Sequence, residues 1–112
     1  MSFEGANEAV VEPRKVRDYL LSSSHPVGQF KAKFFAALGY TPEAWGTLLA
    51  DLRMHAVEGI ASMEETAFGR KYTVSGPLRG PGGKEAQVVS VWIILTGEDA
   101  PRFVTAFPGA RP

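Results

Sequence analysis

Residues 85–96 read Glu-Ala-Gln-Val-Val-Ser-Val-Trp-Ile-Ile-Leu-Thr, and this stretch decides the fold. Its centre, residues 88–95, is apolar on both faces of an extended chain, which is typical of a central β-strand. Residues 80–83, Gly-Pro-Gly-Gly, form a turn signal before it, and residues 97–101 form a second one after it. We therefore predict that 85–96 is the middle strand of an antiparallel sheet.

The segments on either side of these turns alternate in the manner of strands. In residues 70–78, Tyr72, Val74 and Leu78 fall on one face. In residues 102–107, the side chains expected on a common face are Phe103, Thr105 and Phe107. Three strands are thus predicted within 69–108, and a fourth short one is left open for the N-terminal arm or for residues 61–68, an acidic connector.

Upstream of residue 60 the apolar residues recur at helical spacing. Pro13 suits the first position of a helix that ends near Leu21. A second helix is expected over 29–38 with Gly39 as its C-cap, and a third follows with Thr41 as N-cap and ends near residue 59. The fold class is α+β, with about three N-terminal helices packed on a C-terminal three- to four-stranded antiparallel sheet.

Length and composition bound the organisation and the class of protein. The 112 residues suit one domain, with an irregular arm at 1–11, a helical part at 12–59 and the sheet at 69–108. Net charge is zero, which disfavours a general nucleic-acid coat. No apolar run is long enough for a membrane helix, and the acidic N-terminal residues are wrong for a signal peptide, so we expect a cytoplasmic protein without membrane association.

Cofactor and metal signatures are sparse in this sequence. It has no Cys and two His, so we expect neither a zinc site nor any other metal or cofactor. His55 and Glu58 stand three residues apart and could share a metal, but a solvated helical face is the commoner role. The serines at 22–24 precede His25 without the Gly-x-Ser-x-Gly elbow of a nucleophile, so helix capping explains them.

Residues 24–39 contain the strongest candidate site. His25 precedes a proline and is therefore biased towards an extended backbone, and Gly28 permits a tight entry into the next helix. That helix carries Lys31 and Lys33. An imidazole and two cations beside the free N–H groups of a helix N-terminus are suited to binding an anion.

Several segments together resemble a known family. They are residues 15–21 (KVRDYLL), 25–28 (HPVG), 31–35 (KAKFF), 38–40 (LGY), 68–72 (FGRKY), 80–83 (GPGG), 91–94 (VWII) and 101–107 (PRFVTAF). The family is an uncharacterised bacterial domain that occurs as small single-domain proteins and as the C-terminal tip of polymorphic or contact-dependent-inhibition toxins. The resemblance covers nearly the whole chain, from Val11 to Pro108.

The toxin context implies cleavage of nucleic acid, most simply a metal-independent ribonuclease with an immunity-type protein as partner. Such chemistry needs an acid or base near neutrality and cations on the phosphate. His25 would be the acid or base, with Lys31 and Arg102 as clamps and Thr105 as a further catalytic residue that bonds the phosphate. The substrate-binding residues expected from the resemblance are Gly28, Lys33, Arg70 and Tyr72. Val89 stands where many toxin-tip members carry an Arg, which removes one potential clamp.

Each of these residues also has a structural interpretation. His25 can cap the second helix, and the lysines can be solvated. Arg102 can pair with Asp99 or Glu98, Thr105 suits any strand, and Tyr72 suits a core. The alternative functions are a non-catalytic module that binds a protein partner, and a binder of a small anionic ligand at the Gly28 helix entrance.

Overall fold

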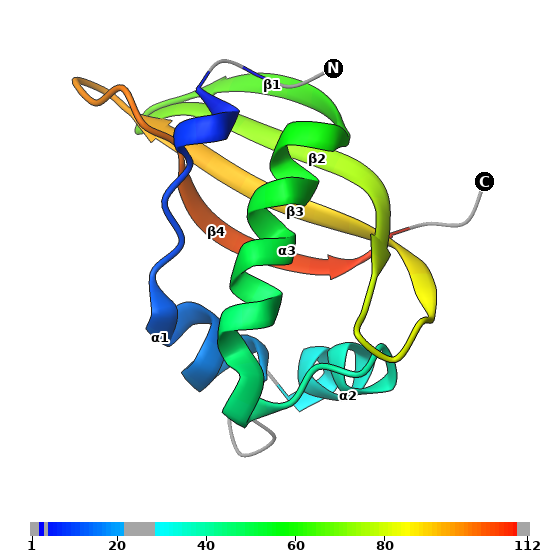
Figure 1. Cartoon of the computed structure of the whole chain (residues 1–112). Helices are drawn as coiled ribbons and strands as arrows, with labels where there is room; N and C mark the ends of the chain where they lie inside the picture. The colour runs from blue at the N-terminus through cyan, green and yellow to red at the C-terminus, as the bar shows by residue number, and fades with distance from the viewer. Residues whose placement is uncertain (1–2, 4, 22–28, 110–112) are drawn as a thin grey trace.

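The computed structural model describes Phe3, residues 5–21 and residues 29–109, with the side chains of all of these except residues 29 and 30. Helices precede a sheet along the chain, as predicted (Figure 1). The elements are η1 (Ala6–Glu8), α1 (Pro13–Lys15), η2 (Val16–Leu20), α2 (Gln29–Ala37), η3 (Pro42–Ala44), α3 (Trp45–Glu58), β1 (Ile60–Thr66), β2 (Gly69–Arg79), β3 (Glu85–Leu95) and β4 (Arg102–Pro108).

The sheet is an antiparallel meander in the order β1-β2-β3-β4. Its first strand, β1, lies in the acidic connector, which was one of the two segments left open for a fourth strand. The segment itself carries no clear strand signal because it lies at the sheet edge: Ile60 and Met63 are exposed, and the burial pattern has no alternation. Gly59, in extended backbone, joins α3 to β1 directly.

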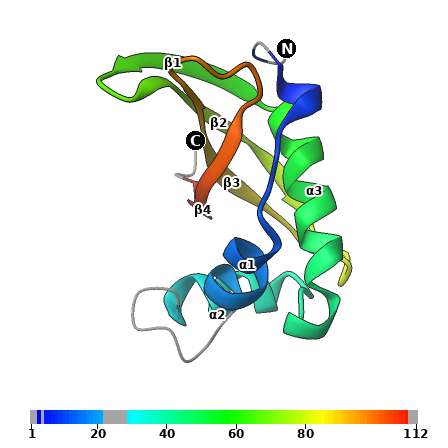
Figure 2. The same ribbon diagram turned by 90° about the vertical axis from the view of Figure 1, so that its left-hand side faces the viewer.

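One face of the sheet carries the core. On β2 and β3 the even-numbered residues are largely buried, and the register pairs Tyr72 with Trp92 and Val74 with Ser90. Helix α3 runs along this face, while α1 and α2 lie at one end of the sheet (Figure 2). The backbone at the end of α3 passes so close to β2 that a Cβ added to Gly59 would collide with the side chain of Val74.

Strand β4 has a bulge that changes which residues share a face. The register pairs Val91 with Thr105 but Trp92 with Phe103, so Val104 is the extra residue. Phe103 and Ala106 therefore turn towards the core, and Thr105 lies on the opposite face. The predicted common face for Phe103 and Thr105 was wrong, because simple alternation cannot anticipate a bulge.

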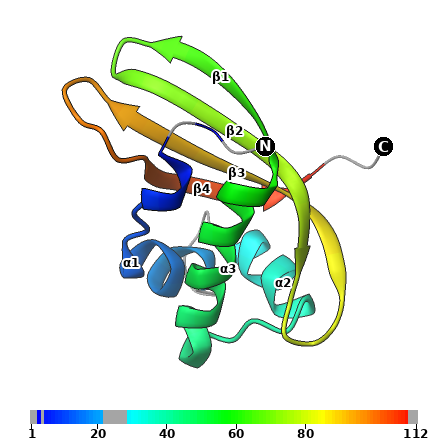
Figure 3. The same cartoon turned by 45° about the horizontal axis from the view of Figure 1, so that its top comes forward.

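The described residues of the N-terminal arm, Phe3 and 5–11, contribute to the core, which the sequence pattern did not predict. Phe3 stacks on Tyr72 with ring centroids 4.4 Å apart. Ala6, Ala9 and Val11 are buried, and the backbone of Val10 is hydrogen-bonded on both sides of Arg102, to Pro101 and Phe103. In Figure 3 this arm runs from the β2–β3 region down to α1.

Both predicted caps around the second loop are confirmed. Gly39 has a φ of 101°, and the side chain of Thr41 accepts a hydrogen bond of 3.2 Å from the Ala44 N–H. We expect Thr41→Ala to lower the free energy of unfolding by about 1 kcal/mol, because it deletes this cap. Urea denaturation measures the effect. The matched variant Thr47→Ala, exposed within α3, should be neutral or slightly stabilising because alanine has the higher helix propensity, and equal losses in both variants would contradict the capping role.

Candidate functional site

The side chain of Lys31 joins three elements that are distant in sequence. Its Nζ donates a hydrogen bond of 2.8 Å to the Tyr19 hydroxyl and one of 3.0 Å to Thr105 Oγ1. Lys31 comes from α2, Tyr19 from η2 and Thr105 from β4. Two of the predicted site residues, Lys31 and Thr105, are therefore in direct contact.

Tyr19 was not predicted as a site residue. The spacing of Val16, Tyr19 and Leu20 is that of one apolar stripe on an α-helix. However, η2 is a π-helix, in which the Leu21 N–H bonds to the Val16 carbonyl at 3.0 Å. Val16 and Leu20 are fully buried, while Tyr19 is only partly buried and turns its hydroxyl to Lys31. Short π-helical segments occur often at functional sites, yet the sequence carries no signal for one.

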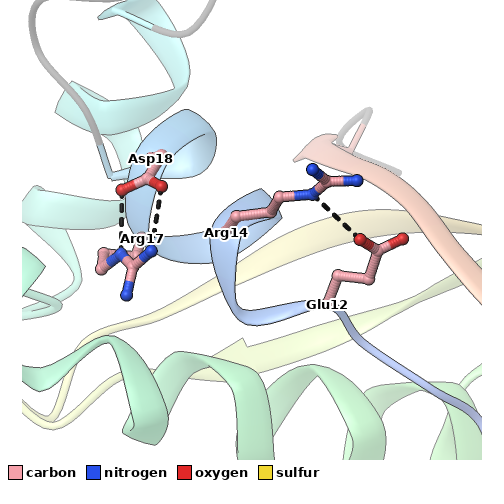
Figure 4. A network of polar contacts seen from close by, with 4 residues as sticks. All are labelled: Glu12, Arg14, Arg17 and Asp18. Atoms are coloured by element: carbon pink, nitrogen blue, oxygen red, sulfur yellow. Dashed lines mark hydrogen bonds and ion pairs between the residues drawn. The ribbon is translucent and has the colours of Figure 1, made fainter.

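The charge of Lys31 is not neutralised by a carboxylate within the described part of the chain. Its partners there are two hydroxyls, and its Nζ also lies 4.9 Å from the centroid of the Tyr19 ring. The arginines nearby differ, as Figure 4 shows: Arg14 bonds to Glu12 at 3.0 Å, and Arg17 bonds to both oxygens of Asp18. The bonds from Arg17 lower the pKa of the Asp18 carboxyl. Lys31 is thus a partly buried cation whose charge is available to an anion.

Arg102 occupies the opposite end of β4 from Pro108 and is engaged in an ion pair. Its Nε and Nη2 donate to the two carboxylate oxygens of Glu98 at 2.8 and 3.0 Å. These hydrogen bonds lower the pKa of Glu98. The structure therefore brings Thr105 to Lys31 but leaves the guanidinium of Arg102 on Glu98, which is one of the two partners that the sequence suggested.

The remaining predicted site residues are not brought together with Lys31 in the described part of the chain. His25 and Gly28 lie outside the described residues. Lys33 is exposed on α2. Tyr72 is 8% exposed and stacks on Phe3, so it belongs to the core, and Arg70 lines a hollow of about 250 Å³ with Glu65 and Glu98 where β2 begins. That hollow is at the other end of the sheet from the Gly82 turn that contacts Leu38 after α2.

His55 has both ring nitrogens occupied by hydrogen bonds. Its Nε2 contacts the carbonyl oxygens of Gly76 and Val88 at 3.1 and 3.0 Å, and carbonyls only accept, so Nε2 carries the proton. Nδ1 then accepts from the Ser90 hydroxyl at 2.7 Å. A metal shared by His55 and Glu58 would need one of these nitrogens, and the described residues contain no group of three or more ligating side chains.

Burial is the main influence on the protonation of His55. It lowers the pKa of the imidazole, while the backbone bonds to Gly76 and Val88 and the charge of Glu58 oppose the shift. The Ser90 oxygen also accepts a bond of 2.9 Å from Trp92 Nε1. A serine beside a histidine can act as a nucleophile with its base, but Ser90 is fully buried among these partners. The pair therefore has a structural role and joins α3 to the sheet.

Comparison with solved structures gives a similar fold. A chain of the contact-dependent growth inhibition toxin–immunity protein complex from Klebsiella pneumoniae 342 superposes with a TM-score of 0.69 and 20% sequence identity, covering 89% of this chain and 99% of that chain. At this identity the likeness establishes the fold alone. No curated protein matches the sequence.

Two further observations concern the class of protein. None of the helices in the described residues has the length and apolarity to cross a bilayer. The profile of the domain of unknown function DUF6883 matches residues 3–110, which is nearly the entire chain. The chain therefore belongs to the DUF6883 family.

Proposed function

We propose that this domain is a toxin-type ribonuclease that works without a metal ion, with Lys31 as its phosphate clamp. The observation that carries the proposal is the ammonium group of Lys31, held by the hydroxyls of Tyr19 and Thr105 and by no carboxylate of the described residues. A cation held in this way can stabilise the charge that develops on a phosphate in the transition state. The fold shared with a chain of a toxin–immunity complex also supports a toxin-type function.

In the proposed reaction the 2′-hydroxyl of the RNA attacks the adjacent phosphorus. The O2′–P bond forms, the P–O5′ bond breaks, and the products are a 2′,3′-cyclic phosphate and a 5′-hydroxyl. A base takes the proton of the 2′-hydroxyl, and an acid gives a proton to the leaving O5′. His25 fills one of these two roles, because an imidazole can both take up and release a proton near neutral pH.

The other residues of the proposal act on binding. Thr105 orients Lys31 and bonds a phosphate oxygen, and Gly28 and Lys33 approach the backbone of the RNA. Arg102 is a second clamp only when a phosphate replaces Glu98 as its partner. Arg70 contacts RNA beyond the cleaved bond, while Tyr72 supports the site from the core because its ring is stacked on Phe3.

Incubation of the purified protein with total RNA in the presence of EDTA tests the proposal. The wild type should cleave, and Lys31→Ala should cleave about 100-fold more slowly, which is the usual cost of deleting one transition-state donor. Arg53→Ala removes an exposed cation of α3 and is the charge-matched control, with unchanged cleavage. Intact RNA with the wild type, loss of cleavage in EDTA, or equal rates for Lys31→Ala and the control would each contradict the proposal.

The second candidate is a non-catalytic module of the same fold that binds an immunity-type protein. It is favoured by Val89, because the resemblance to toxin-tip domains implies an arginine at this position and the chain has none there. Expression in a bacterial host separates the two candidates: a ribonuclease arrests growth and Lys31→Ala relieves the arrest, while a binding module leaves growth unchanged in both.

A further inference from the structure

The hydroxyl of Tyr19 lies in direct contact with the cation that the proposed reaction uses. Its oxygen accepts the 2.8 Å hydrogen bond from Lys31 Nζ, and its ring centroid lies 4.9 Å from the same nitrogen. The segment η2 that carries Tyr19 contacts α2, and α2 contacts β4, so three elements hold this group in place. Tyr19, Lys31 and Thr105 are all partly exposed, which leaves their polar groups within reach of a substrate.

The geometry of the ammonium group places the Tyr19 hydroxyl beside a bound phosphate. An ammonium has three N–H donors at tetrahedral angles, and within the described residues two of those of Lys31 bond to Tyr19 and Thr105. The third suits an oxygen of the phosphate. Two acceptors on one ammonium lie about 4.7 Å apart, since each hydrogen bond is about 2.9 Å long. Another oxygen on the same phosphorus can therefore lie within hydrogen-bond reach of the Tyr19 hydroxyl.

The chemistry of a phenol suits the donation of a proton at this place. The bond from Lys31 uses a lone pair of the Tyr19 oxygen and does not use the phenol proton. A phenol keeps that proton at neutral pH, so it enters a reaction as an acid. The phenolate that forms when the proton leaves has the positive charge of Lys31 at 2.8 Å, and this attraction stabilises it.

Thr105 also has a hydroxyl on Lys31, at 3.0 Å. An aliphatic alcohol is a far weaker acid than a phenol, so Thr105 cannot compete with Tyr19 as a proton donor. Its hydroxyl can orient Lys31 and bond a phosphate oxygen without giving up a proton. The two hydroxyls on the same ammonium therefore differ in the chemistry that they can supply.

We propose that Tyr19 is the general acid of the ribonuclease reaction and gives its proton to the leaving O5′. The electron pair of the P–O5′ bond goes to O5′, which takes the phenol proton, and Tyr19 remains as a phenolate beside Lys31. The base that takes the proton of the 2′-hydroxyl is then His25. Afterwards His25 releases its proton to water, and the phenolate takes one up. The inference rests on the proposed function and adds a catalytic residue to it.

A change of leaving atom distinguishes an acid from a group that only positions Lys31. An RNA oligonucleotide that the wild type cleaves is prepared a second time with sulfur in place of O5′ at the cleaved bond. A thiolate leaves without being protonated, so the sulfur substrate needs no acid. Tyr19→Phe keeps the ring and removes the hydroxyl. It should cleave the oxygen substrate about 100-fold more slowly with little change in KM, and the sulfur substrate within about threefold of the wild-type rate.

Two further variants serve as controls. Lys31→Ala should slow the cleavage of both substrates, because the clamp stabilises charge on the phosphate whichever atom leaves. Tyr40→Phe is the matched control: it removes a tyrosine hydroxyl that donates a 2.6 Å hydrogen bond to Asp51 of α3 and not to Lys31. Its rates on both substrates should equal those of the wild type.

The outcomes separate this inference from the proposed function. Equal losses of Tyr19→Phe on the oxygen and sulfur substrates would overturn the acid role, make Tyr19 a positioning residue of Lys31 and leave the ribonuclease intact. A wild-type rate of Tyr19→Phe on the oxygen substrate would overturn the acid role as well. If the wild type leaves all RNA intact, the proposed function is wrong and the acid role is wrong with it.

Discussion

Replacement of Ser90 by alanine is expected to lower the free energy of unfolding by about 3 kcal/mol, since each buried polar group left without a partner costs about 1–3 kcal/mol. The serine oxygen lies between Trp92 Nε1 and His55 Nδ1, at 2.9 and 2.7 Å. It accepts from the indole and donates to the imidazole, so the single hydroxyl satisfies one buried group on each side. Alanine would leave both the indole N–H and the imidazole Nδ1 unpaired in the core.

Chemical denaturation of Ser90→Ala beside Ser75→Ala measures this effect. Ser75 is exposed on β2, so its hydroxyl can be replaced by water, and its variant should differ from the wild type by less than about 0.5 kcal/mol. The indole N–H resonance of Trp92 should also move in Ser90→Ala, because it loses its acceptor. A loss below about 1 kcal/mol, or an unmoved indole resonance, would show that the hydroxyl is not the shared partner.

Sequence patterning predicted those elements whose structure depends mainly on their own residues. Strand β3 is buried on its core face and carries apolar residues on the other. It can therefore be predicted as a central strand even if the neighbouring strands are assigned incorrectly. Gly39 and Thr41 are local signals whose meaning depends on backbone geometry alone. For β3 the burial of apolar side chains decides the structure, and at Gly39 and Thr41 the local backbone conformation does.

The parts that the sequence left open or did not predict depend on tertiary contacts. Strand β1 takes its structure from pairing with β2 in a continuous register, although its own residues are mostly exposed. The sequence of the N-terminal arm is polar and predicts an irregular segment, but in the structure Phe3 packs against Tyr72 and Trp92 of the sheet. Neither contact has a signature within the segment itself.

The same distinction applies to the candidate site. Lys31 could be selected from its place in the Lys-Ala-Lys segment, and Thr105 from its strand, but their contact spans 74 residues of sequence. Tyr19 could not be selected, because its orientation depends on the π-helical turn between Val16 and Leu21. Arg102 shows the reverse case: an arginine four residues after Glu98 forms a local ion pair, so its charge is already matched.

Lowering the pH from 7.5 to 5.5 should reduce the stability of the domain by about 1 kcal/mol, through His55 alone. Burial lowers the folded-state pKa of His55 below its ordinary value of 6.5, so the unfolded chain binds the proton more readily. The stability contributed by the neutral imidazole is therefore complete above pH 6.5 and is lost as the pH falls from there towards the folded pKa. The slope cannot exceed about 1.4 kcal/mol per pH unit for one group.

The hydrogen bonds of His55 give the physical reason for this direction. A proton added to Nδ1 turns it from an acceptor into a donor, and the Ser90 hydroxyl that now donates to it must turn away. Ser90 would then accept from both His55 and Trp92, and its own proton would lose its partner in a fully buried place. Glu58 favours the charged form, but its side chain is exposed to solvent, which weakens its effect.

The second histidine of the chain supplies the control. Urea denaturation at pH 7.5, 6.5 and 5.5 stays above the range in which most carboxylates titrate, so histidines dominate the change. His25→Gln should retain the loss of stability between pH 7.5 and 5.5, and His55→Gln should lose this pH dependence even though its stability is lower throughout. Stability that is constant or rises as the pH falls in the wild type would mean that His55 accepts its proton as easily in the fold as outside it, and the hydrogen-bond directions assigned to Ser90 would then be wrong.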